Sequence, residues 1–219
     1  MQTIIGESKR YLDIDLGRRS FSAFSPPEED LRDYLGGKAL GLKLIYDRMG
    51  RGAMLAGLDP LGPENILAFM MGTFIGTGAP CSARFAGVTK SPLTGIMVGS
   101  SCGGPFGMAC KTAGWDGMLV SGAADRPLIL RIDEEGALFE EAGELWGLGT
   151  EEAQRRLVDN PRVGALVIGP AGENGVLRID GRNGVGSQLS ANFRPNVRTG
   201  CFPLHIRDVG VWPIKRQPD

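Results

Sequence analysis

Histidine is nearly absent from this sequence, and its cysteines lack the spacing of a metal site. The 219 residues include one histidine, His205, and four cysteines with no C-x-x-C pair: Cys81, Cys102, Cys110 and Cys201. This spacing indicates neither a zinc ribbon nor a disulfide framework, so we interpret the thiols as buried or neutral. Histidine-based catalysis is also disfavoured, because His205 lies in an irregular segment and is best interpreted as a surface residue.

The sequence also lacks an excess of one charge and any long apolar run. Its 24 basic and 25 acidic residues nearly cancel, which leaves no global field to attract nucleic acid or an anionic membrane. No run reaches the ~18 apolar residues of a membrane span, and residues 1–10 do not have the charged head and apolar core of a signal peptide. We therefore expect a cytoplasmic protein that contacts neither nucleic acid nor membrane.

Glycine, by contrast, is abundant. The 34 glycines are about twice the ordinary usage of ~7%, and they follow neither a collagen period nor a linker pattern. With 42% hydrophobic and 22% charged residues, the chain has the composition of one globular domain. Its glycines therefore mark either tight turns or places where the backbone approaches another group closely.

The chain begins with a sheet pattern that gives way to a helical one. Two alternating runs, 11–16 and 20–24, are separated by a glycine turn and predict a β-hairpin. Ser25 then predicts a helix N-cap, with Pro26 at the first helical position. The apolar spacing that follows is helical, and we expect it to break at Gly36-Gly37.

Short apolar runs recur through the rest of the chain and predict strands. These runs are 66–71, 84–89, 118–120, 127–133 and 163–168. Leu128, Leu130 and Ile132 would share one face of their strand, while helices are expected near Pro105 and from Thr150. Because the strands do not alternate regularly with helices, we predict an α+β fold with two mixed β-sheets of short strands and a few helices.

One glycine-rich segment is well suited to bind an anion. Ser100-Ser-Cys-Gly-Gly104 runs into the expected helix start, where free amides and the helix dipole favour phosphate oxygens. Arg84 lies among small residues and is a candidate clamp, because a guanidinium can grip a phosphate at two points. The same features are also typical of a tight turn with a surface arginine, so both interpretations stay open.

A second candidate segment is Gly181-Arg-Asn-Gly-Val-Gly186, in which Arg182, Asn183 and Gly184 combine a cation with a permissive backbone. Other sites are less well supported. Gly36-Gly-Lys-Ala has the wrong spacing for a Walker A loop, and no dinucleotide-binding G-x-G-x-x-G follows a strand. The carboxylates of Asp15, Asp59 and Glu173 are unspecific.

Several motifs resemble, in order, those of the aldehyde:ferredoxin oxidoreductase family, the tungsten-pterin enzymes. The most specific are Leu58-Asp-Pro-Leu-Gly-Pro-Glu-Asn65, Gly76-Thr-Gly-Ala-Pro80, Val88-Thr-Lys-Ser-Pro-Leu-Thr-Gly95, Gly103-Gly-Pro-Phe-Gly107, Ala113-Gly-Trp-Asp116 and Ile168-Gly-Pro-Ala-Gly-Glu-Asn174. Leu35-Gly-Gly-Lys-Ala-Leu-Gly41 and Leu145-Trp-Gly147 add to the match. The resemblance implies that residues 1–189 form the family's N-terminal, pterin-cofactor-binding domain, whereas residues 190–219 are a divergent, poorly ordered tail.

The resemblance also implies a cofactor and the residues that hold it. The family binds a tungsten or molybdenum bis-pterin whose phosphates are bridged by magnesium. The implied cofactor-binding residues are Arg84, Ser101, Gly103, Gly104, Arg182, Asn183 and Gly184. Ser101 replaces the family's asparagine at the magnesium, where a hydroxyl remains but a strong carbonyl ligand is lost.

The activity implied by the resemblance is oxidation of aldehydes to carboxylic acids with ferredoxin as acceptor. The family's helical domains carry the cysteines of a [4Fe–4S] cluster, and those cysteines are absent from this sequence. We therefore expect the isolated chain to be inactive and to need a separate cluster-bearing subunit, through which ferredoxin would bind. The alternatives are a noncatalytic pterin- or anion-binding module and a truncated remnant; a homo-oligomer is a further expectation for its assembly.

Overall fold

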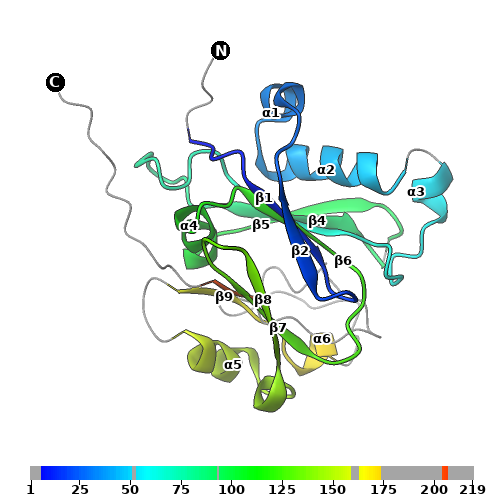
Figure 1. Ribbon diagram of the computed structural model, residues 1–219, viewed down its shortest axis with the longest axis vertical. Helices are drawn as coiled ribbons and strands as arrows, with labels where there is room; N and C mark the ends of the chain where they lie inside the picture. The colour runs from blue at the N-terminus through cyan, green and yellow to red at the C-terminus, as the bar shows by residue number, and fades with distance from the viewer. Residues whose placement is uncertain (1–5, 51–52, 93, 159–162, 174–203, 207–219) are drawn as a thin grey trace.

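The computed structural model describes residues 6–50, 53–92, 94–158, 163–173 and 204–206 of the chain. They form four layers, in which two β-sheets pack face to face and helices cover both outer surfaces (Figure 1). The fold is α+β with two mixed sheets, as the sequence predicts.

The larger sheet has six strands in the order β2-β1-β6-β3-β4-β5. Its strands are β1 (Tyr11–Asp15), β2 (Ser20–Phe24), β3 (Leu67–Met71), β4 (Phe85–Lys90), β5 (Met97–Cys102) and β6 (Gly117–Ser121). β1 and β6 are parallel and the other neighbours are antiparallel. The predicted hairpin of β1 and β2 is confirmed, but β5 was not predicted as a strand because its small residues carry no apolar alternation.

The smaller sheet has four strands in the order β8-β7-β10-β9. They are β7 (Leu128–Ile132), β8 (Ala137–Glu141), β9 (Gly164–Leu166) and β10 (Leu204–Ile206). β10 pairs with β7 in parallel and with β9 in antiparallel fashion. From the sequence, the three residues of β10 were expected in a tail without a period; the rest of that tail lies outside the described residues.

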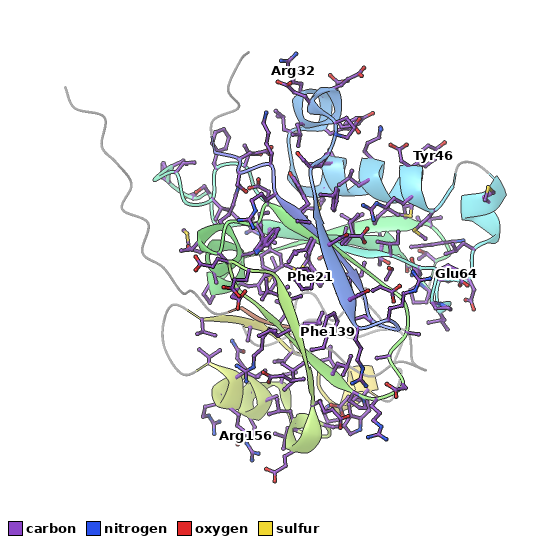
Figure 2. All side chains as sticks on the ribbon, viewed as in Figure 1. Phe21, Arg32, Tyr46, Glu64, Phe139 and Arg156 are labelled. Atoms are coloured by element: carbon purple, nitrogen blue, oxygen red, sulfur yellow. The ribbon has the colours of Figure 1, made fainter. Side chains whose placement is uncertain are left out.

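The main core lies between the two sheets. Leu128, Leu130 and Ile132 of β7 are fully buried there, which confirms the predicted face of this strand. Helix α4 (Pro105–Thr112) closes one end of this layer by burying Phe106 and Cys110. At the front of the molecule, Phe21 of β2 lies over Gly136 in the β7–β8 turn, and Figure 2 shows it near that hairpin.

The outer face of the larger sheet is covered by α1 (Glu28–Tyr34) and α2 (Gly37–Arg48). The predicted break at Gly36-Gly37 is confirmed, since α1 ends before it and Leu35 adopts a left-handed φ of 57°. The predicted cap at Ser25 is wrong. Helix α1 has Pro27 at its N-cap without a side-chain cap, because two consecutive prolines keep this segment extended.

The remaining helices are short. Helix α3 (Ala53–Gly57) follows α2, and helix α6 (Pro170–Glu173) follows β9. The outer face of the smaller sheet is covered by α5 (Thr150–Leu157) and by the 3₁₀ turn η1 (Gly143–Leu145). Across the described residues, no helix is long and apolar enough to cross a membrane.

Candidate functional site

Strands β4 and β5 bring the predicted anion-binding residues together at one end of the larger sheet. Phe85 pairs with Cys102 at the end of their antiparallel ladder. Arg84 directly precedes Phe85 and Gly103 directly follows Cys102, so the two residues are opposite each other at the next position outward. The sequence separates Arg84 and Gly103 by 19 positions, and the ladder makes them neighbours.

The backbone at this corner is open and rich in unpaired amide groups. Gly104 is the N-cap of α4 and has a φ of 112°, a conformation that favours glycine. Pro105 follows at the start of the helix, so the first free helical N–H groups belong to Phe106 and Gly107. Gly103, unlike Gly104, does not have a left-handed φ, and a Cβ atom built on Gly103 would meet no described atom within 4 Å.

Arg84 supplies the positive charge of the corner. Its side chain is exposed and forms no ion pair with any residue in the described ranges. Burial raises the pKa of the Cys102 thiol, whereas the charge of Arg84 acts to lower it; the thiol donates a hydrogen bond to the Gly103 carbonyl at 3.2 Å. A free arginine beside an open glycine can hold an oxyanion at two points.

Ser101 lies one residue before Cys102 and faces the opposite side of the sheet. Cys102 enters the core between the sheets, while the α2 side of β5 carries Met97, Gly99 and Ser101. Ser101 is half-buried, and its hydroxyl has no hydrogen-bond partner within the described part of the chain. Its hydroxyl oxygen could therefore meet a magnesium ion.

A metal-binding cluster is not found around it. Among residues 6–50, 53–92, 94–158, 163–173 and 204–206, no three His, Cys, Asp or Glu side chains could together hold a metal ion. Because Mg²⁺ usually binds through one or two carboxylates together with phosphate oxygens and waters, the hydroxyl of Ser101 alone is a poor protein ligand for it. The other predicted segment, with Arg182, Asn183 and Gly184, lies outside the described residues.

Lys38 of α2 was not expected at this site from the sequence. The side chain of Lys38 lies along Gly99 of β5, with its Cγ and Cδ atoms 3.2 Å from where a Cβ atom of Gly99 would stand. Lys38 is exposed and makes no ion pair in the described part of the structure. The only sequence signal was a glycine in a strand, which often marks the close approach of another group.

Other motifs of the sequence serve the fold. Asn65 donates hydrogen bonds to the carbonyls of Pro60 and Lys90 and accepts one from Thr89. The buried ammonium group of Lys90 donates to the carbonyls of Ala56 and Leu58 at 2.8 and 2.7 Å. These contacts fasten the 58–65 turn to β4.

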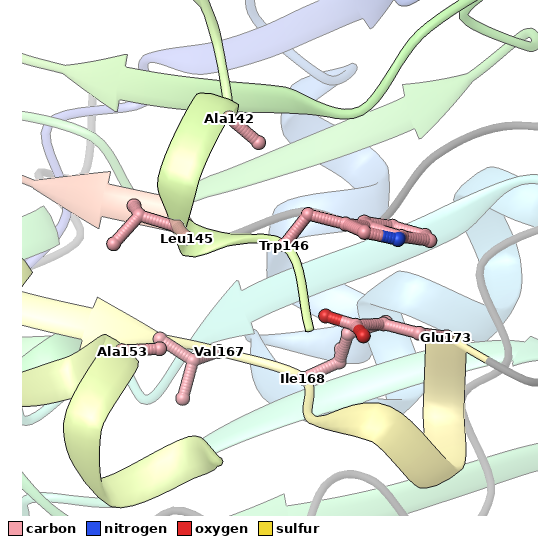
Figure 3. Close-up of a pocket in the computed structure, with 7 residues that line it drawn as sticks. All are labelled: Ala142, Leu145, Trp146, Ala153, Val167, Ile168 and Glu173. Carbon is pink, nitrogen blue, oxygen red and sulfur yellow. The ribbon is translucent and has the colours of Figure 1, made fainter. Parts of the chain in front are cut away.

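Figure 3 shows a second structural junction, where Glu173 meets the 145–147 segment. Both carboxylate oxygens of Glu173 accept the Gly147 N–H at 3.0 Å. The cavity between Trp146 and Ile168 has a volume of only about 10 Å³, which is no more than the space for one water molecule. Asp15 and Asp59 likewise accept backbone N–H groups in turns, so none of the three carboxylates forms a catalytic cluster.

The N-terminal segment is fastened by Asp116, at the end of the 113–116 motif. Asp116 is buried, pairs with Lys111, and accepts hydrogen bonds from Ser8 Oγ and Lys9 N at 2.8 and 2.6 Å. Lys111 also donates to the Gly6 carbonyl at 2.6 Å. A cleft of about 830 Å³ opens beside these groups, between the N-terminal segment, α4 and the 75–77 loop.

The fold is shared with a redox enzyme. The chain superposes on a chain of the active site complex BamBC of benzoyl coenzyme A reductase in complex with 1,5-dienoyl-CoA, with a TM-score of 0.80 and 27% identity. The match covers 93% of this chain and 31% of that chain. Fold and site together define a two-sheet domain that matches 31% of that chain, with a candidate anion-binding corner at one end.

The family can be stated more narrowly. Residues 11–189 match the family model of the aldehyde ferredoxin oxidoreductase N-terminal domain, and the chain belongs to this family. The tungsten-containing aldehyde ferredoxin oxidoreductase of Pyrococcus horikoshii is 36% identical over 84% of this chain, and that of Pyrococcus furiosus is 33% identical over 93%. The P. furiosus aliphatic sulfonate oxidoreductase, WOR-like subunit, is 28% identical over 89% of the chain. The chain spans 32 to 35% of the length of these relatives.

Proposed function

We propose that this chain is the cofactor-holding base of a tungsten- or molybdenum-pterin oxidoreductase. The observation that carries the proposal is that Arg84, which has no ion-pair partner among the described residues, and Gly103 both lie just beyond the Phe85–Cys102 end of the β4–β5 ladder. Neither a left-handed backbone nor a described neighbour requires glycine at position 103. The close approach of a bound oxyanion does explain it.

The phosphate groups of a pterin cofactor fit the chemistry of this corner. Arg84 would grip phosphate oxygens, and the amides around Gly103 and Gly104 would donate to them near the positive end of α4. The bound metal–pterin centre supplies the redox chemistry by which an aldehyde becomes a carboxylic acid. The task of these residues is to orient the cofactor and neutralise its phosphates.

The complete reaction would need groups supplied by further domains or by a separate subunit. Cys102 and Cys110 are buried in the core between the sheets, and Cys81 is exposed in a loop, so these three thiols do not converge on a cluster site. A [4Fe–4S] cluster and the binding of ferredoxin would therefore come from a cluster-bearing partner. Aldehyde oxidation by this chain is proposed only for that assembly.

The test is elemental analysis of the protein purified from its native host together with any bound polypeptides. Tungsten or molybdenum is expected with phosphorus in the wild-type protein. Arg84→Ala should lower the metal and phosphorus content at least several-fold, whereas Arg18→Ala, in the exposed β1–β2 turn, should not. Wild-type protein free of tungsten, molybdenum and phosphorus would overturn the proposal; iron in the same sample would identify the cluster-bearing partner.

A further inference from the structure

A second cation lies near the anion-binding corner and has no structural partner. Lys38 projects from α2 onto β5, where its stem occupies the space left by the missing side chain of Gly99. Its charge is exposed, and no carboxylate pairs with it in the described part of the chain. Two other lysines pair with carboxylates: Lys43 with Asp30 and Asp47, and Lys111 with Asp116.

The stem of Lys38 lies on the side of β5 that also carries Ser101. Gly99 and Ser101 are two residues apart on β5 and share the α2 side of the sheet, so their Cα atoms are separated by about 6.6 Å. The ammonium group is one methylene beyond the Cδ atom that touches Gly99. Ser101 in turn pairs with Ala86, two residues from Arg84. A phosphate held by Arg84 is therefore flanked by Ser101 and approached from the α2 side by Lys38.

The charges at this corner favour a phosphate without a bridging metal. The corner combines two cations, Lys38 and Arg84, with the hydroxyl of Ser101. The described residues provide no carboxylate cluster that could hold a divalent ion. Each cation balances one negative charge of a phosphate directly. Among the described side chains of the corner, a magnesium ion would find one oxygen and two repelling positive charges.

We propose that Lys38 is a further phosphate-binding residue of this site, and that Lys38 and Arg84 together neutralise the phosphate without a divalent cation. This inference rests on the proposed function, because it concerns the same phosphate site. It adds a binding residue from α2 and predicts that binding does not depend on magnesium.

The experiment is a titration of the full 219-residue chain with inorganic pyrophosphate, followed by ³¹P NMR, in EDTA and in magnesium. The affinity of the wild-type chain for pyrophosphate should be the same in EDTA as in magnesium. Lys38→Gln should weaken it about tenfold, the loss expected for one charge-assisted contact, and Gly99→Val should weaken it by displacing Lys38 without removing its charge. Ser101→Asn should make binding stronger in magnesium than in EDTA, and Arg18→Gln serves as the charge-matched control.

The outcomes separate the two proposals. Pyrophosphate that binds the wild type only in magnesium, or binds Lys38→Gln as tightly as the wild type, overturns the role of Lys38 and leaves the Arg84 site intact. An absence of binding in both conditions overturns the phosphate site itself and the inference with it. Circular dichroism of each variant, measured beside the titration, distinguishes loss of binding from loss of fold.

Discussion

Glycine occupies position 103 although the fold does not require it there. Its φ is not left-handed, and no described atom lies within 4 Å of the position that a Cβ atom would take. We expect Gly103→Ala to change the free energy of unfolding by no more than about 0.5 kcal/mol, yet to weaken pyrophosphate binding, because a methyl group would stand where the ligand approaches. Urea unfolding and the ³¹P titration measure the two effects. A variant that is unstable, or that binds normally, would contradict this expectation.

The carboxyl group of Glu7 is poorly satisfied. Its Oε1 accepts a 3.3 Å hydrogen bond from Thr73, but its Oε2 is buried without a partner among the described residues. Burial, and then the neighbouring charge of Asp116, raise the pKa of Glu7 above its ordinary value of 4.5, against the weaker opposing effect of Lys111. The folded chain therefore keeps this proton to higher pH than the unfolded chain, so stability falls as pH rises from about 4.5 through the folded-state pKa.

Glu7→Gln removes this penalty while keeping the shape of the side chain. The variant should be more stable than the wild type at pH 7, and the difference should shrink toward zero at pH 4, where Glu7 is mostly protonated in both states. Urea midpoints at the two pH values test the prediction. The exposed Glu135→Gln is the control, with no such pH-dependent gain; a difference that grows as pH falls would show that the sign is wrong.

The contact between α4 and β9 sets the position of the candidate anion-binding corner. A Cβ atom on Gly164 would lie 2.4 Å from the Cα atom of Phe106 and 2.8 Å from its nitrogen. Because both atoms belong to the backbone of the helix start, rotation of a side chain cannot relieve the clash. Gly164 therefore allows α4 to begin against the smaller sheet while Gly104 faces the site.

Gly164→Ala should destabilise the protein by about 1–3 kcal/mol, the cost typical of overpacking, and should also weaken pyrophosphate binding by shifting the first turn of α4. Gly149→Ala is the matched control, because its Cβ atom would meet nothing within 4 Å. Urea unfolding of both variants measures the difference. Equal stability of the two would mean that α4 and β9 can move apart at little cost.

Elements with strong local signals were predictable, and contacts between elements were not. The β1–β2 hairpin, the buried face of β7, the break at Gly36-Gly37 and the helix start at Pro105 all follow from alternation, glycine and proline. The start of α1 was wrong because two prolines override the Ser25 cap. Lys38 could not be assigned, since its role arises from α2 crossing β5, a tertiary contact that no local pattern encodes.

At the scale of the whole molecule, the residues of the site gather at one end of the larger sheet. β1, β4 and β6 begin at this end, β3 and β5 finish there, and the β3–β6 and β4–β5 registers place Asp116, Arg84 and Gly103 in one row of strand ends. The sequence predicts Arg84 and Gly103 as separate candidates for phosphate binding. The pairing of β4 with β5 explains why the two residues would bind one phosphate together. Arg182, Asn183 and Gly184 remain predictions.

The same end of the molecule exposes apolar surface. Phe74 is 64% exposed and Met108 is 43% exposed, and the sulfur of Met108 lies 4.0 Å from the Cβ position of Gly76, which belongs to the same loop as Phe74. Such a patch favours association, and the family relatives, about three times as long as this chain, have further residues that could cover it. The isolated chain should therefore self-associate through this surface.

Phe74→Ser combined with Met108→Ser should reduce that self-association without loss of fold, because both side chains are largely outside the core. In sedimentation velocity, the weight-average sedimentation coefficient should rise with protein concentration for the wild type and should not change with concentration for the double variant. Met54→Ser removes an equally apolar side chain from α3, 72% exposed and on another part of the surface, so it should behave as the wild type. If all three proteins associate alike, the contact lies on another part of the surface, and the end of the sheet that carries Arg84 and Gly103 is not covered by a second copy.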